Sequence, residues 1–382
     1  MTEIFDFDQE IDRRNTRSVK WEKYGDRDIL PMWVADSDFA VVPAIQQALH
    51  DRADYPVFGY TESSKHLANL LVQRMADRYG WEIDAEWIVF LPGIVGALFL
   101  ACRAVGKPGD PVYLPQIIYP PFGKAPDLNE RVRQPMQMRT EAQRMIIDLD
   151  WLEQQAPQFG QLLLLCNPQN PGGAVYRESE LARLADFAER NDLIVCSDEI
   201  HCDLILEPGL RHTPIASLNP QIEQRSITLM APSKTFNLAG LGCAFAIVPN
   251  RLLRSKMKTN PYIVPHVNIM GYAAAEAAYE FGDEWNRQQC AYLAANRDYL
   301  IEEINRIPGL SLGPIEATYL AWIDVSALQL DDPPGFFENA GVGMSAGQDF
   351  GDAGFMRLNF ACPRSRVEEA VRRIRTAVEA LS

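Results

Sequence analysis

The sequence lacks the patterns that mark membrane, zinc-binding and nucleic-acid-binding proteins. No apolar run reaches the roughly 20 residues that a membrane-spanning helix needs, and the acidic first ten residues have no basic-then-apolar signal pattern. The 7 cysteines include no CxxC pair, and the nearest two, Cys196 and Cys202, have a spacing that common zinc sites do not use. A net charge of -15, with no basic stripe, argues against nucleic acid as a partner. We therefore expect a cytoplasmic location, no membrane contact, no metal site and reduced, buried cysteines.

The composition is that of an ordinary soluble protein, with 47% apolar and 23% charged residues. At 382 residues the chain exceeds the size of most single cores, which favours one large and one smaller domain. From about residue 87, short aliphatic runs alternate with stretches of helical periodicity, so we predict an α/β fold. Several runs are continuously apolar, as expected for a mostly parallel sheet covered by helices on both faces. The predicted strands of this sheet are Trp87–Leu91, Val112–Leu114, Leu162–Cys166, Leu193–Ser197, Ile227–Met230 and Cys243–Val248.

The C-terminal third has a different pattern. A helical stretch from Asn268 to Asn305 contains Gly282, where we predict a break. Beyond it, two further strands and an amphipathic helix predict a smaller α/β domain. The expected division is an N-terminal segment (1–45) packed on the small domain, a large domain (46–282) and a small domain (283–382). The remaining predicted elements are helices Gly96–Val105, Glu178–Arg190 and Arg364–Leu381 and strands Tyr319–Val325 and Phe355–Phe360.

Lys234 follows an apolar strand directly, within the string APSKTFNLAGL. A lysine in such a turn is often a solvated charge. A partly desolvated lysine at the carboxyl end of a strand can instead form an imine with an aldehyde cofactor.

Asp198 and His201 lie in SDEIH, at the end of another strand. Asp198 is either a simple cap or a carboxylate that keeps a heterocyclic nitrogen protonated, because an opposite charge favours the charged form. His201 is either a core histidine or a hydrogen-bonding partner of a ring oxygen.

Two further strings follow strands. NPQNPGG, at 167–173, is first of all a turn, but its Asn170 offers a rigid amide. LPGIVG, at 91–96, leads from a strand into a helix, whose backbone N–H groups and dipole favour a phosphate.

These four strings, in this order, resemble the fold-type-I pyridoxal 5'-phosphate (PLP) enzymes of the aspartate aminotransferase superfamily, class I/II. The resemblance runs from about residue 30 to the C-terminus. Further strings resemble the cystathionine β-lyase or carbon–sulfur lyase branch of that family: PMWVADSDF at 31–39, VFGYT at 57–61, and DEIH with HTP at 198–201 and 212–214.

The resemblance implies a role for each matching residue. Lys234 would carry PLP as a Schiff base and later remove the Cα proton. Asp198 would face the pyridine nitrogen, and Asn170 and His201 the ring oxygen. Tyr119, in YPPF, would stack on the ring, although it could also be an aromatic wedge in a proline-rich turn. Lys234, Asp198 and Tyr119 form the predicted catalytic set.

The phosphate would be held by the Ile94 and Val95 amides, the Ser233 hydroxyl and Tyr60 of a second subunit, which implies a homodimer with its active sites at the interface. Many aminotransferases have an arginine eight residues after the lysine, but this sequence has Gly242 there. Phosphate binding must then use other donors.

The substrate would be a small amino acid bound by Arg357, Asn170 and Ala35, with Arg357 gripping its α-carboxylate. Two positions depart from the lyase pattern, Gln169 in place of histidine and Ala174 in place of arginine, so the substrate can differ from cystathionine. We expect β-elimination of cystathionine or another cysteine S-conjugate. An aminotransferase reaction is the alternative, and a regulatory protein that retains the PLP fold is the alternative of another class.

Overall fold

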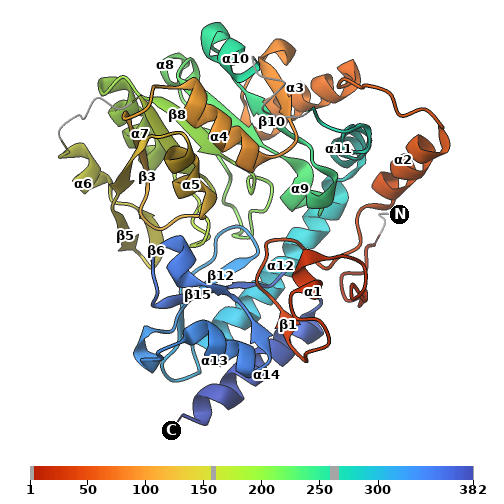
Figure 1. The fold of residues 1–382 in the computed structure, drawn as a ribbon, viewed down its shortest axis with the longest axis vertical. Coiled ribbons are helices and arrows are strands. Elements are labelled where there is room, and N and C mark those ends of the chain that lie inside the picture. Colours follow the sequence, from red (N-terminus) through yellow and green to blue (C-terminus); the bar gives the residue numbers. More distant parts are fainter. Residues whose placement is uncertain (1–3, 156–160, 259–265, 382) are drawn as a thin grey trace.

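A seven-stranded sheet forms the centre of the larger part of the chain (Figure 1). The computed structural model describes residues 4–155, 161–258 and 266–381. Within this sheet β10 alone runs antiparallel to its neighbours, which confirms the predicted mostly parallel arrangement. Across the sheet the order is β2 (Ile88–Leu91), β10 (Ala244–Ile247), β9 (Ser226–Met230), β8 (Ile194–Asp198), β7 (Leu162–Cys166), β3 (Pro111–Pro115) and β4 (Val132–Met136).

Strand β7 shows why the central strands are apolar throughout. All its residues are buried. Because side chains alternate across a strand, Leu162 and Leu164 join the core beneath α4 (Ile94–Ala104), whereas Leu163 and Leu165 join the core beneath α7 (Glu178–Arg190). Helices thus cover both faces, as the continuous apolar runs predicted.

Other helices complete the larger part of the chain. They are α2 (Pro43–Asp54), α3 (Lys65–Tyr79), α5 (Pro121–Leu128), α6 (Leu149–Glu153), α8 (Pro220–Glu223), α9 (Pro232–Thr235), α10 (Arg251–Lys258) and α11 (Ile269–Phe281). A hairpin of β5 (Met138–Glu141) and β6 (Arg144–Ile147) projects beside the sheet.

The predicted helix break at Gly282 is present, since α11 ends at Phe281, α12 (Asp283–Ile304) begins at Asp283, and Gly282 lies between them. A Cβ atom at Gly282 would collide with Ala278 O and with the ring of Phe236. Close packing therefore requires glycine at this position.

A second, four-stranded antiparallel sheet lies near the C-terminus (blue in Figure 1). Its order is β11 (Ser311–Leu312), β12 (Leu320–Asp324), β15 (Phe355–Asn359) and β14 (Ser345–Ala346), with α13 (Pro333–Asn339) and α14 (Arg364–Glu379) beside it. The N-terminal segment, which holds α1 (Val19–Glu22), lies next to this part (red in Figure 1), because β1 (Leu30–Pro31) pairs with β13 (Val342–Gly343). The domain limits at 45 and 282 remain predictions.

No helix in the described ranges is long and apolar enough to cross a bilayer.

Candidate active site

One cavity of about 280 Å³ lies where five strands of the large sheet end. Such carboxyl-terminal edges are where open α/β sheets bind ligands. Asp198 ends β8, and the other contributing segments follow β9, β7, β3 and β2. The cavity is lined by every predicted site residue except Tyr60: Ala35, Ile94, Val95, Tyr119, Asn170, Asp198, His201, Ser233, Lys234 and Arg357.

Tyr60 lies away from this cavity, on the loop between α2 and α3, with its side chain fully exposed. Tyr60 is expected to bind the phosphate in the active site of a second subunit, and that role stays a prediction.

Lys234 presents its amine to the cavity from α9. Its Nζ donates a hydrogen bond to the carbonyl oxygen of Ala35 over 2.5 Å. Burial and the nearby charge of Arg357 lower the pKa of Lys234 to about 8, against the opposing effects of Asp36 and Asp198. The amine is thus desolvated and loses its proton more readily than a surface lysine, as an imine-forming nucleophile requires.

Asp198 is a buried carboxylate with no ion-pair partner among the described residues. Its Oδ1 accepts a hydrogen bond from the backbone N–H of Ile200 at 3.1 Å. Burial raises the pKa of Asp198 to about 7, although the Ile200 amide and Lys234 oppose this shift. A cationic nitrogen placed beside it would stabilise the carboxylate, because an opposite charge favours the ionised form.

His201 is buried, and its Nδ1 has no hydrogen-bond partner within the described part of the chain. Burial, with the charges of Lys234 and Arg357, lowers the pKa of His201 to about 3. The ring is therefore neutral and packs edge-on against Tyr319 with centroids 5.9 Å apart. A buried unpaired nitrogen that borders a cavity is suited to a polar ligand atom.

Arg357 reaches the cavity from β15 of the second sheet. Its Nη1 donates to Asn170 Oδ1 at 3.0 Å and its Nη2 to the Trp33 carbonyl oxygen at 2.9 Å. The guanidinium lies 4.5 Å above the ring centroid of Phe350. Burial lowers the pKa of Arg357 to about 10, so it stays cationic at neutral pH.

No carboxylate pairs with Arg357 among the residues described, and its Nε has no partner there. A buried cation without an anion is costly. An incoming carboxylate would bind this guanidinium through two parallel hydrogen bonds.

Tyr119 follows β3 and lies beside the same cavity, partly buried. Burial raises the pKa of its phenol, with the Arg357 charge opposing. The phenol is therefore protonated at neutral pH, and its ring is available for packing on a flat ligand.

The start of α4 provides a seat for an anion. Gly93 is the N-cap residue and brings no side chain, while Ile94 and Val95 open the helix. Their N–H groups have no intrahelical acceptor, since the first four amides of a helix lack one.

Gly242 has φ +61°, a conformation that side chains rarely adopt, and a Cβ there would lie 3.2 Å from the Pro92 carbonyl oxygen. A side chain at this position would therefore be strained. That the α4 backbone and the Ser233 hydroxyl bind the phosphate stays a prediction.

The polar groups of the cavity fit PLP. The unpaired carboxylate matches its ring nitrogen, and the unpaired imidazole nitrogen matches its ring oxygen. The desolvated amine matches the aldehyde, and the helix N-terminus matches the phosphate.

Sequence reasoning missed several lining residues, because they carry no polar signal and sit in ordinary strand or turn positions. These are Val34, Leu98, Cys166, Ile200, Ala239 and Cys243.

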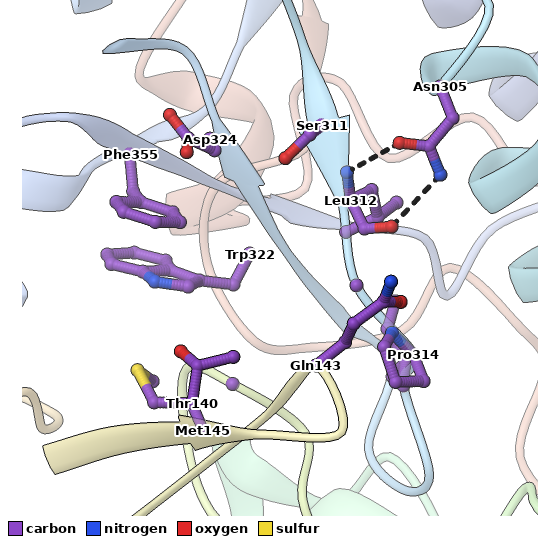
Figure 2. A pocket seen from close by; sticks show the side chains of 13 residues that line it. Thr140, Gln143, Met145, Asn305, Ser311, Leu312, Pro314, Trp322, Asp324 and Phe355 are labelled. Carbon is purple, nitrogen blue, oxygen red and sulfur yellow. Dashed lines mark hydrogen bonds between the residues drawn. The ribbon is translucent and has the colours of Figure 1, made fainter.

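A second pocket of about 410 Å³ shares no lining residue with this cavity. Figure 2 shows Thr140, Gln143 and Met145 of the β5–β6 hairpin on one side of it, facing the second sheet. There Trp322 stacks on Phe355 with centroids 5.0 Å apart. None of the predicted site residues lines this pocket, and we assign it no part of the chemistry.

Comparison with known proteins agrees with this geometry. Residues 28–374 match the family model "Aminotransferase class I and II". Cystathionine beta-lyase PatB of Bacillus subtilis is 35% identical over 97% of this chain and 99% of its own length.

Two solved structures are also similar. One is OvoB, which is 49% identical, with a TM-score of 0.94 over 98% of this chain and 99% of its own. The other is cystalysin from Treponema denticola, whose structure contains a pyridoxal 5'-phosphate cofactor; it is 32% identical, with a TM-score of 0.94 and full coverage of both chains. The chain belongs to the class I and II aminotransferase family of fold-type-I PLP enzymes, in the branch that holds the carbon–sulfur lyases.

Proposed function

We propose that this protein is a PLP-dependent carbon–sulfur β-lyase. It cleaves cystathionine or a related cysteine S-conjugate, with one water, to a thiol, pyruvate and ammonia. One observation carries the proposal: a single cavity holds a desolvated amine (Lys234), an unpaired buried carboxylate (Asp198) and an unpaired buried guanidinium (Arg357). Bound PLP supplies an electron sink that stabilises negative charge at the substrate Cα.

The chain's own residues bind and orient the substrate. Arg357 takes the α-carboxylate, and its existing bonds to Asn170 and Trp33 fix the plane of the guanidinium. Asn170, held at the end of β7, keeps an amide nitrogen for the substrate or cofactor. Ala35 presents its carbonyl oxygen toward the amine of Lys234, which positions that amine before the substrate arrives.

The remaining groups manage protons. The Lys234 amine, with its lowered pKa, can accept the Cα proton and return a proton to the departing sulfur. Asp198 keeps the ring nitrogen of bound PLP protonated. Burial makes a carboxylate without a cationic partner unfavourable, and the protonated nitrogen is that partner. His201 and Tyr119 hold the pyridine ring of bound PLP in place.

The test is a product balance. Purified holoenzyme is incubated with cystathionine and with S-methylcysteine, and pyruvate, ammonia and thiol are measured. Equal amounts of the three products, without any added 2-oxo acid, are expected. Turnover that needs a 2-oxo acid and yields no thiol would contradict β-elimination and indicate an aminotransferase.

We also propose a homodimer. The loop that leads to Tyr60 exposes Tyr55, Val57 and Phe58, each more than half accessible. A cluster of exposed apolar side chains is typical of an interaction surface. A second copy of the chain is the partner that the Tyr60 prediction requires.

We propose a cytoplasmic location because the cysteines are free thiols. All seven are free thiols, and six of them are buried. Free thiols persist in reducing compartments.

A further inference from the structure

A buried pair of side chains, Glu199 and His212, lies behind Asp198 on the side away from the active-site cavity. Both are almost fully buried, and neither lines the cavity. Neighbouring side chains of an extended chain point to opposite sides, so Glu199 points away from the cavity that Asp198 lines. His212 belongs to the HTP string at 212–214, which has no part in the chemistry described so far.

Both carboxylate oxygens of Glu199 are engaged in hydrogen bonds. Ser197 Oγ donates to Oε1 over 2.8 Å, and His212 Nε2 lies 2.7 Å from Oε2. The backbone N–H of Glu199 donates to the Leu229 carbonyl oxygen at 2.8 Å, which fixes the residue against the neighbouring strand β9. The carboxylate is therefore held in one place.

Asn167 joins this pair to the backbone of Asp198. Its side-chain Nδ2 donates to the Thr213 carbonyl oxygen at 3.3 Å, next to His212 in the chain. Its backbone N–H donates to the Asp198 carbonyl oxygen at 3.0 Å. The segment that carries His212 and the residue that faces the cavity are thus parts of one hydrogen-bonded unit.

The contacts of His212 indicate how the pair is charged. Its Nδ1 has no hydrogen-bond partner within the described part of the chain. An imidazolium would bury a charged N–H donor without an acceptor at this atom, which is costly. A neutral ring with its proton on Nε2 avoids that cost and donates to Glu199. Glu199 then accepts two hydrogen bonds as an ionised carboxylate.

The other titratable groups nearby do not neutralise Glu199. Tyr79 of α3 packs edge-on against His212 with centroids 5.5 Å apart, but its hydroxyl donates to Asp203 at 3.2 Å. Burial raises the pKa of Tyr79 and of the Cys202 thiol well above their usual values, so both are neutral. Asp203 is itself paired with two arginines of α3, Arg74 and Arg78.

We propose that Glu199, held ionised by Ser197 and His212, is a positioning residue that acts through Asp198 on the ring nitrogen of bound PLP. A second fixed negative charge behind Asp198 makes a cation in front of it more favourable, so the ring nitrogen keeps its proton to higher pH. The inference rests on the proposed placing of Asp198 opposite that nitrogen. It holds for β-elimination and for transamination alike, since both need the electron sink.

The electrostatics of Asp198 agree with this role. Burial is the main cause of its raised pKa, and the charge of Glu199 raises the pKa further. The Ile200 amide and Lys234, on the cavity side, oppose both effects. Removing the charge of Glu199 should therefore lower the pKa of Asp198.

The first test measures the proton affinity of Asp198 in cofactor-free protein. Infrared spectroscopy follows the carbonyl band of the protonated side chain, which Asp198→Asn lacks. The midpoint is expected near pH 7 in the wild type. It should be about one pH unit lower in Glu199→Gln, because the amide keeps the size of the side chain but loses its charge. Ser197→Ala removes one donor to Glu199 and should lower the midpoint by less.

The second test uses the holoenzyme. Nitrogen NMR of isotope-labelled PLP gives the pH at which the ring nitrogen loses its proton. That pH should be highest in the wild type, lower in Ser197→Ala and lowest in Glu199→Gln. Circular dichroism should show that each variant is folded.

Glu316→Gln is the matched control for both tests. Glu316 is also a buried carboxylate, but it pairs with Arg144 at 3.1 Å and does not line the cavity. Its midpoints should equal those of the wild type. His212→Gln keeps a neutral donor to Glu199, so its midpoints should also stay in place.

Three results would overturn the inference: unchanged midpoints in Glu199→Gln, a higher midpoint in His212→Gln, which would make His212 a cation, or a protonated carboxyl band that only Glu199→Gln removes. If Asp198→Asn leaves the nitrogen signal unchanged, the role given to Asp198 fails as well. The product balance that tests the lyase reaction is independent of these titrations, so either proposal can fail while the other stands.

Discussion

The guanidinium of Arg357 donates a hydrogen bond to Asn170 Oδ1 over 3.0 Å and thereby joins the two sheets at the active site. Arg357 lies on β15 of the four-stranded sheet, whereas Asn170 follows β7 of the seven-stranded sheet. The geometry of the carboxylate site therefore depends on how the two parts of the chain pack together. A change on either side of this contact should alter substrate binding.

Replacing Arg357 with lysine should lower kcat/KM by about 100-fold, because an ammonium keeps the charge but loses the paired donors that bind a carboxylate. The fall should appear mainly in KM. Ser345→Ala is the control. It removes a 3.3 Å contact to the same guanidinium and a 2.8 Å hydrogen bond to the Trp33 carbonyl oxygen but leaves the paired donors of Arg357 in place, so it should change kcat/KM by less than about threefold. A lysine variant with wild-type kcat/KM would show that Arg357 does not hold the substrate.

Lys234→Ala should lower turnover by at least about 1000-fold, since the variant lacks both the imine-forming amine and the proton acceptor. The visible absorption of enzyme-bound PLP should shift to that of non-covalently bound PLP. Circular dichroism of the variant should match the wild type, which separates lost chemistry from lost folding. Intact turnover would contradict the central role given to this amine.

Asp198→Asn should change stability and activity in opposite directions. The folded state raises the pKa of Asp198 from 3.8 to about 7 in the cofactor-free protein, so the folded chain binds this proton more tightly than the unfolded chain. Stability that depends on this group therefore falls as pH rises from about 4 to 7. The asparagine variant avoids this loss, and the melting temperature of its cofactor-free form should exceed that of the wild type more at pH 8 than at pH 5. Its holoenzyme should turn over more slowly, because the ring nitrogen loses its anionic partner. A melting-temperature difference that is the same at both pH values would contradict the raised pKa.

The rate at which cofactor-free protein attaches PLP should rise with pH through a midpoint near pH 8 and level off above it. Only the neutral amine of Lys234 attacks an aldehyde, and its pKa is about 8. Below that pH the neutral fraction falls about tenfold per pH unit. Stopped-flow absorbance measures this rate. Arg357→Met removes a charge that lowers the pKa of Lys234, so the midpoint should move to higher pH; a midpoint that stays in place would contradict this cause.

Tyr60 can be tested by mixing subunits. If it serves the neighbouring active site, dimers with one Tyr60→Ala chain and one Lys234→Ala chain have one site that carries both defects and one intact site. Co-expression should then yield active protein from two chains that are each defective alone. No recovery in isolated mixed dimers would show that Tyr60 does not act across an interface.

Much of the local structure could be predicted from sequence. Strand β7 and helix α7 have the predicted ends at Leu162–Cys166 and Glu178–Arg190. The break at Gly282 was visible because a glycine interrupted a long helical period. Such signals are local, since they depend on residues a few positions apart. The polar strings after the strands were also visible, and their predicted members line one cavity.

Periodicity and side-chain type are local properties of the chain, and they were enough to predict most of the elements and the turn residues. The kind of chemistry was implied by the resemblance of four polar strings to a known family. The antiparallel position of β10 between β2 and β9 became known only from the folded chain. The same holds for the contact of Arg357 with Asn170 and for the pocket that Arg13, Asp36 and Lys234 line together. These contacts join residues far apart in sequence, and they form because two sheets and the N-terminal segment bury a shared apolar core. No short string of residues carries that information.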